Sequence, residues 1–434
     1  MSLRSYLGEL FLVPYPLELS LVEPCDIGCV YCFANLGDRA SEYKTSTKTI
    51  EKAKGRAKNG LKDILNAFIN ADKRTSLEAR LFNDRYPVLM SNRTDPFGRK
   101  NRLAAIAVLE LFKEMGVPTA FQTKGFVKHD QDFDRVMSLI EPSHWYISIT
   151  FLEDNDRVQQ VEPGSMPIAY RWELVKELKR RGHVVSIGWN PWVPEWFGGL
   201  AGGYKFIEKM VDAGVDACAI QPLHLHQHWI MTDQEKQALH GGDMVWWENI
   251  AGKKKPPAHW MPIFYELNKA AYDAGIPQIG HHFGWGHDLW GSTHKLYKKT
   301  YPTIADFAWH CKQTKQWGDR VTFREWYNWV MSWDVPQGNY GLGSGLALKS
   351  WRMVPKISEW MGWKNFHTKL SWETFLKISW AWQDKIQSYS PAAMPSFCPV
   401  VDKNQNIVLD DELLPVLAWT PAPDHPMDYC IAIE

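Results

Sequence analysis

The chain has 434 residues, of which 45% are apolar, so it is long enough for one large domain or two ordinary ones with a sizeable core. Its 49 basic residues balance its 49 acidic residues, which excludes a protein that binds polyanions through overall charge. It has no apolar run of bilayer length, no leader-like start and an odd count of 7 cysteines, so we expect a protein of the reducing cytoplasm without a membrane partner.

The first half of the chain alternates strand-like apolar runs with helical patterns. The helical stretches carry apolar residues at i, i+3 and i+4, and several end at a glycine such as Gly116, Gly182 or Gly214. Six repeats of strand then helix predict an α/β protein with a parallel sheet curled into a partial (βα)6 barrel, with a doubly wound open sheet as the competing architecture. The strands are expected at 17–22, 87–91, 118–123, 145–150, 184–190 and 215–221.

Tryptophan separates the two halves of the chain, because 5 of the 23 tryptophans precede residue 217 and 18 follow it. We therefore expect a barrel domain at 1–228 and a mainly helical, tryptophan-rich region at 229–434 that caps the active site, with a candidate seventh βα unit at 262–282. Trp326, Trp329 and Trp333 have helical spacing, which favours packing in a core over platforms that stack bases. The final stretch, 400–429, is expected to wrap the surface.

Three cysteines lie within eight residues of the segment "EPCDIGCVYCF", directly after the first expected strand. Cys25, Cys29 and Cys32 have the spacing of metal ligands, since soft thiolate sulfur selects zinc or iron–sulfur clusters. Structural zinc needs a fourth ligand at a recognisable spacing, and the next cysteine is Cys218. Three ligands on a four-iron cluster would leave one iron open, as a catalytic cluster requires.

This motif, with an aromatic residue (Tyr31) before the last cysteine, resembles that of the radical S-adenosylmethionine (SAM) superfamily. The resemblance implies a 4Fe–4S cluster on Cys25, Cys29 and Cys32 whose open iron binds the amino and carboxylate groups of SAM. It also implies reductive cleavage of SAM to a 5′-deoxyadenosyl radical, which abstracts hydrogen from a substrate, and an external electron donor of the flavodoxin or ferredoxin type.

Further motifs resemble the spore photoproduct lyase-like branch of that superfamily. They are "VLMSNRTDPF" after the second strand, "QTKGF" after the third, "SIT" in the fourth, the "EPGS" turn and "WNPWVP" on the fifth. The resemblance implies that Asp95 or neighbours such as Asn92 hold the SAM ammonium and that Lys124 holds its carboxylate. Ser148 and Asn190 would bind the ribose or the methionine part, and Tyr31 and Phe33 would flank the cofactor on either side of Cys32.

Two departures from the branch concern its repair reaction. The lyases use a further cysteine as hydrogen donor, and this chain has no cysteine between residues 33 and 217. They also have a tyrosine directly after the last cluster cysteine, where this chain has Phe33, which lacks a hydroxyl group. We therefore expect a shared scaffold without repair of the thymine photoproduct by that relay.

Histidines follow the sixth strand and the candidate seventh strand. His224 and His226, in "PLHLHQHW", and His282, in "GHHFGWGH", are candidates for substrate contact or proton donation, because imidazole titrates near neutral pH. A second metal site and plain packing among aromatic residues are the alternatives.

Basic residues between 44 and 62, together with those at 253–255, could form a phosphate-binding track or a solvated helix face. With the branch resemblance, they favour a nucleic-acid base or a modified nucleotide as the substrate, and DNA or a nucleotide as partner. An enzyme acting on an amino acid, a peptide or another metabolite is the second hypothesis. A non-catalytic iron–sulfur or nucleic-acid binding protein is the third.

Overall fold

A computed structural model describes the parts of the chain to which all structural statements below refer. They are residues 2–5, 14–21, 25–32, 81–90, 94–223, 232–240, 259–276, 289–300, 302, 304–333, 397–400 and most of 402–419. The chain forms two compact units, which are described separately. The first contains 1–3, 18–67 and 87–276, and the second contains 4–17, 68–86 and 277–434.

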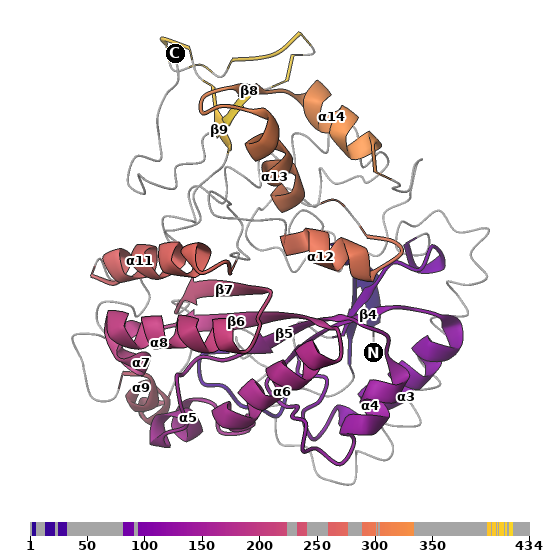
Figure 1. Ribbon diagram of the computed structural model, residues 1–434, viewed down its shortest axis with the longest axis vertical. Coiled ribbons are helices and arrows are strands. Elements are labelled where there is room, and N and C mark those ends of the chain that lie inside the picture. Colours follow the sequence, from indigo (N-terminus) through magenta and orange to yellow (C-terminus); the bar gives the residue numbers. More distant parts are fainter. Residues whose placement is uncertain are drawn as a thin grey trace. The chain divides into compact units, whose positions relative to one another are not determined.

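A seven-stranded sheet organises the first unit, and its strands follow one another in chain order. Figure 1 shows β4 to β7 of this sheet. β3 to β7 pair in parallel, with Ile147 opposite Ile187 between β5 and β6. β1 and β7 are the two edge strands, so the sheet does not close into a complete barrel. The expected α/β fold with a partial barrel is confirmed. The strands are β1 (Ser2–Ser5), β2 (Leu17–Ser20), β3 (Val88–Met90), β4 (Thr119–Thr123), β5 (His144–Ser148), β6 (Val184–Trp192) and β7 (Ala217–Pro222).

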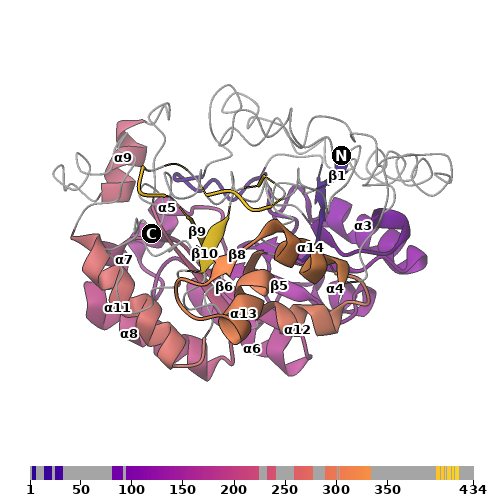
Figure 2. The same cartoon turned by 90° about the horizontal axis from the view of Figure 1, so that it is seen from above.

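Amphipathic helices connect the strands, and Figures 1 and 2 show α3, α4, α6 and α8 lying along the sheet. α3 buries the apolar face that its sequence pattern predicts and ends at Gly116, whose φ of 64° is left-handed. α5 and α7, each shorter than two turns, were not expected from the sequence. The helices of this unit are α3 (Arg102–Met115), α4 (Phe133–Leu139), α5 (Asp156–Val161), α6 (Ile168–Arg180), α7 (Pro194–Phe197), α8 (Gly199–Asp212), α9 (Asp233–His240) and α11 (Trp260–Asp273).

Stacked aromatic side chains join the sheet to its surroundings in the first unit. The ring of Trp145 on β5 stacks on Phe121 of β4 with centroids 4.2 Å apart. The ring of Trp189 on β6 stacks on Phe206 of α8 at 4.0 Å. Since such rings bury a large apolar area, they stabilise the packing of β4, β5 and β6 in the core of this unit.

The second unit contains three described helices and a small antiparallel sheet of order β8-β10-β9. In α14, Trp326 is buried and packs against Phe307 of α13 at 5.1 Å, as the core interpretation of this tryptophan spacing predicts. The stretch expected to wrap the surface contributes β10, which pairs with β9 just before that stretch, and Val400, Val416 and Ala418 bury a small core of their own. The elements are α12 (Leu289–Leu296), α13 (Ile304–Thr314), β8 (Arg320–Val321), α14 (Phe323–Met331), β9 (Phe397–Pro399) and β10 (Leu417–Trp419).

The boundary between the two units lies further along the chain than the expected division at residue 228. α9 and α11 belong to the unit that contains the sheet, and α11 packs on α8, where Gly203 leaves room for Leu267. α11 is the helix of the candidate seventh unit, whose strand falls largely outside the described residues. Among the helices that are described, none has the length and apolar character needed to cross a bilayer.

Candidate active site

The cysteine loop, residues 25–32, follows β2 and carries three cysteines, none of which forms a disulfide. Cys29 is buried, and Cys25 and Cys32 are half-buried. Gly28, with φ of 70°, supplies a left-handed turn that a side chain would strain, and the Cys32 N–H donates to the Cys29 carbonyl at 3.1 Å. The close spacing in the sequence is therefore realised as a compact turn.

The turn at residues 161–166, between α5 and α6, holds the cysteine loop through its backbone. The Val30 N–H donates to the Val161 carbonyl at 3.0 Å, and the Gly164 N–H donates to the Ile27 carbonyl at 2.7 Å. A Cβ at Gly164 would lie 2.5 Å from the carbonyl oxygen of Asp26, so only glycine permits this approach. The "EPGS" motif thus packs directly on the loop.

Asp26 anchors the other side of the cysteine loop. Its Oδ2 accepts the Lys100 N–H at 3.1 Å, and its Oδ1 is buried without a hydrogen-bond partner in the described part of the chain. A Cβ at Gly98 would lie 2.3 Å from Oδ1, so this second glycine is also required by a close approach.

Asp95 lies between β3 and α3 and is buried. Its carboxylate accepts four hydrogen bonds: from the Phe97 N–H at 2.9 Å, the Thr123 hydroxyl at 2.8 Å, and the N–H groups of Lys124 and Gly125 at 2.6 and 3.0 Å. Burial raises the pKa of Asp95, and these donated bonds oppose that shift. The carboxylate therefore shapes the backbone that carries Lys124, while its role toward a SAM ammonium stays a prediction.

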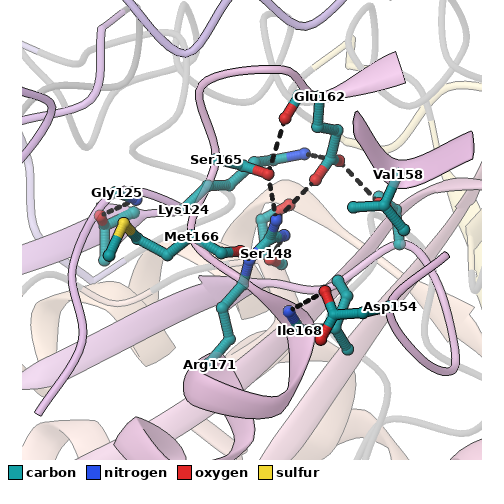
Figure 3. A network of polar contacts seen from close by, with 12 residues as sticks. Lys124, Gly125, Ser148, Asp154, Val158, Glu162, Ser165, Met166, Ile168 and Arg171 are labelled. Atoms are coloured by element: carbon teal, nitrogen blue, oxygen red, sulfur yellow. Dashed lines mark hydrogen bonds and ion pairs between the residues drawn. The ribbon is translucent and has the colours of Figure 1, made fainter. Parts of the chain in front are cut away.

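A buried ionic network centred on Glu162 joins four elements (Figure 3). Glu162 Oε1 accepts hydrogen bonds from Lys124 Nζ at 2.6 Å and from the Thr150 hydroxyl at 2.6 Å, and Oε2 accepts one from Arg171 at 2.8 Å. Arg171 also donates to the carbonyl oxygens of Ser148 at 2.9 Å and Met166 at 2.7 Å. The network therefore ties the ends of β4 and β5 to α6.

Tyr31 brings the cysteine loop into this network. Its hydroxyl donates to Glu162 Oε1 and accepts a hydrogen bond from Lys124 Nζ. The ammonium of Lys124 also lies 4.7 Å from the centre of the Tyr31 ring. Burial raises the pKa of Tyr31, so the phenol keeps its proton. Tyr31, which precedes Cys32, thus donates to the same Glu162 oxygen that accepts a hydrogen bond from Lys124.

The charges of the network do not cancel. Burial alone would raise the pKa of Glu162, but Lys124 and Arg171 outweigh it and hold this pKa below its usual range. The side chains of Glu162 and Arg171 are both fully buried, whereas that of Lys124 is 14% exposed. Because one carboxylate faces two cations, the accessible Lys124 carries a surplus positive charge that an anion can neutralise.

Ser148 and Asn190 lie near the carboxyl ends of β5 and β6, where the sequence placed them. The Ser148 hydroxyl donates to the Gly188 and Asn190 carbonyls at 3.5 Å each, and Asn190 Nδ2 donates to Gln221 Oε1 at 2.6 Å. Both side chains are therefore held by the neighbouring strand. Their predicted contacts with the ribose or methionine part of SAM stay predictions.

Several predicted residues lie outside the described part of the chain. This applies to Phe33, Asn92, His224, His226 and His282, and to the basic segments at 44–62 and 253–255. Of the predicted cofactor ligands, the structure brings together Tyr31 and Lys124, with Asp95 holding the Lys124 backbone.

Glu162 and Arg171 belong to the site but were not predicted from the sequence. The "EPGS" motif had drawn attention to the turn without assigning its glutamate a role. The spacing of nine residues places the two on different elements, so no helical periodicity connects them. The only signal available was a carboxylate in the motif and a guanidinium in the helix α6 that follows it.

The chemistry of the cysteine loop fits an iron–sulfur cluster. In the part of the chain that the structure describes, no three histidine, cysteine, aspartate or glutamate side chains converge closely enough for a single metal ion. A four-iron cluster bonds each cysteine to a different iron, so the thiols need not meet at one point. Burial raises the pKa of Cys29 to about 12 and also raises that of Cys25, and cationic iron reverses this preference by stabilising the thiolates.

Comparisons with known proteins find structures but no sequence family. No family model and no curated protein matches the chain. Solved structures that match include spore photoproduct lyase with bound SAM and a dinucleoside spore photoproduct, at 14% identity and a TM-score of 0.32 over 52% of this chain. SuiB from Streptococcus suis, bound to SAM, matches at 14% identity and a TM-score of 0.29 over 49% of this chain. The chain spans 60% of the lyase and 40% of SuiB.

Proposed function

We propose that this protein is a radical SAM enzyme, with a 4Fe–4S cluster on Cys25, Cys29 and Cys32. The observation that carries the proposal is the joint placement of three cysteine thiols on one loop and a surplus cation. The loop that bears the thiols contacts the Glu162 network through Tyr31, and that network leaves Lys124 with an unneutralised charge. A SAM molecule needs both an iron and a partner for its carboxylate.

The chain's own residues would bind and orient SAM. Lys124 attracts the carboxylate, Asp95 holds the backbone of the Lys124–Gly125 segment, and Ser148 and Asn190 present polar groups at neighbouring strand ends. These groups lie at the carboxyl end of the sheet, because parallel strands all finish at that end. When bound, the cluster supplies the electron that cleaves SAM reductively.

We propose a nucleic-acid base or a modified nucleotide as the substrate. The motifs at 88–97, 122–126 and 189–194 support this, because they resemble the lyase-like branch. A base within a duplex would have to leave the stack to reach a buried radical. An amino acid, peptide or other metabolite is the alternative. Salt-sensitive binding of DNA or RNA supports the first substrate class, and absence of binding to any polynucleotide or nucleotide contradicts it.

Anaerobic reconstitution with iron and sulfide tests the chemistry. We expect about four irons per chain for a 4Fe–4S centre, a low-temperature paramagnetic resonance signal after reduction, and 5′-deoxyadenosine from SAM. Cys29→Ala should abolish the signal and the product. Cys311→Ala, which removes a buried thiol of the second unit, should retain both. A reconstituted wild-type protein that never cleaves SAM would leave only the non-catalytic binding function.

Deuterated candidate substrates then separate the substrate classes. The true substrate transfers its label to 5′-deoxyadenosine, which mass spectrometry detects. Label from a nucleoside supports the proposal, and label from an amino acid or peptide replaces it with the alternative.

A further inference from the structure

One oxygen atom of Glu162 is shared by donors from three segments. Oε1 accepts hydrogen bonds from Lys124 after β4, from Thr150 after β5 and from Tyr31 in the cysteine loop. A carboxylate oxygen offers about two lone-pair directions, so three donors compete for it. Any change in one donor therefore alters the strength of the other two bonds.

Lys124 is the charged donor that an anion can reach. Its side chain keeps 14% of its surface exposed, whereas Thr150 is fully buried and Glu162 Oε2 is occupied by Arg171. An anion that binds the Lys124 ammonium draws it from Oε1 and from the Tyr31 hydroxyl. The remaining donors, Tyr31 and Thr150, then share the oxygen between them.

The cysteine loop follows Tyr31 because backbone bonds connect it to the same turn. The hydrogen bonds from Val30 to Val161 and from Gly164 to Ile27 lie on either side of Glu162 in the chain. A firmer Tyr31–Glu162 bond therefore adds to two contacts that already hold the loop, and it restrains the segment that carries the thiols.

We propose that Glu162 is a positioning residue that couples Lys124 to the cysteine loop through Tyr31. An anion on Lys124, which is the SAM carboxylate if the proposed function holds, stabilises the loop. By linkage, a stabilised loop also favours the anion by the same factor. The inference rests on the proposed function for the identity of the anion, and on the Glu162 contacts for the coupling.

A double-mutant cycle on the cluster-free, full-length protein tests the coupling. Lys124→Met removes the competing donor and also the direct hydrogen bond from Lys124 to the Tyr31 hydroxyl. If the competition for Oε1 dominates, amide hydrogen exchange in a peptide covering residues 25–32 should slow about fivefold relative to a β6 peptide, the lower range of typical coupling, and faster exchange would overturn the proposal. In a Tyr31→Phe background, the same substitution should leave the exchange of the loop unchanged. Tyr31→Phe is preferred to Glu162→Gln, which would leave Arg171 buried beside a neutral group.

Thr150→Val tests the competition itself, because Thr150 donates to the same oxygen but does not touch the cysteine loop through an observed hydrogen bond. In this background only two donors remain for Oε1, so Lys124→Met should slow exchange of the loop less than in the wild type. Equal effects of Lys124→Met with and without the Tyr31 hydroxyl, or no effect in the wild type, would overturn the coupling.

The SAM cleavage assay keeps the two proposals apart. Coupling without cleavage in reconstituted wild-type protein would retain the role of Glu162 for another anion and remove the proposed function. Cleavage without coupling would retain the enzyme and remove the role of Glu162.

Discussion

The two ends of the parallel sheet bury titratable side chains in opposite ways. At the carboxyl end, Lys124 and Arg171 hold the pKa of Glu162 below its usual range despite the opposing effect of burial. At the amino end, burial lowers the pKa of His144, at the start of β5, to about 3, and that of His183, just before β6, to about 4. The first end keeps its charges, and the second keeps its imidazoles neutral.

The difference shows what a buried charge requires. Glu162 receives two cations and several hydrogen bonds, which compensate its lost hydration. His144 shares a hydrogen bond of 2.7 Å between its Nε2 and the Ser186 hydroxyl, and burial keeps the ring neutral. The end with compensated charges is suited to binding a charged cofactor, and the neutral end is suited to supporting it. Four substitutions with their controls test this contrast.

Arg171→Met should lower the free energy of unfolding by about 3–5 kcal/mol, because it breaks a buried ion pair. It also removes donors to the Ser148 and Met166 carbonyls. Urea unfolding measures the loss. The control is Arg180→Met, which removes an exposed pair with Glu177 and should change stability little. Equal losses of stability in both variants would show that the buried ion pair at the carboxyl end stabilises the fold no more than the exposed pair does.

Asp95→Asn should cost about 2–4 kcal/mol, since the new amide group faces backbone donors that the carboxylate accepts, and buried donors lose about 1–3 kcal/mol each when unsatisfied. The comparison at the amino end is Asp216→Asn. Asp216 is partly exposed and accepts from the Val185 N–H and Lys179. Chemical unfolding should show the smaller loss for Asp216→Asn, and the reverse order would refute the interpretation.

Gly164→Ala should displace the cysteine loop, because its Cβ would meet backbone atoms of Asp26 and Ile27. Overpacking of this kind costs about 1–3 kcal/mol. Iron bound per chain after reconstitution should fall with it. Gly214→Ala is the control: its φ of 68° strains alanine, but no atom lies within 4 Å of the new Cβ. It should lower stability without loss of iron, and iron loss in both variants would remove the specific role of Gly164.

His144→Gln should flatten the pH dependence of stability in acid. In the wild type, the unfolded chain binds a proton below about pH 6.5 while folded His144 does not until about pH 3, so stability falls as pH falls through this window. One such proton contributes up to about 1.4 kcal/mol per pH unit. Urea unfolding at several pH values measures the slope.

Ser186→Ala is the matched control for His144→Gln, because it removes the partner of the imidazole and keeps the titrating ring. It should lower stability while the slope persists. An unchanged slope in His144→Gln would show that His144 is protonated in the folded protein.

Local patterns in the sequence predicted much of the fold and one part of the site. The six strand runs and the main helices of the first unit lie where their periodicity indicated, as with β5 at His144–Ser148 and α6 at Ile168–Arg180. The short helix α5 and the pairing of β8 with β10 were not predicted. The first is too short for periodicity, and the second joins Val321 to Leu417, which are far apart in the chain.

The alternation of strands and helices and the grouping of three thiols on one turn follow from the sequence alone, because these features depend on residues close together in the chain. Which charges meet depends on the tertiary structure. Glu162 finds Lys124 38 residues away and Tyr31 131 residues away. Such contacts depend on the order and register of the strands. Parallel strands from distant parts of the chain all finish at the same end of the sheet.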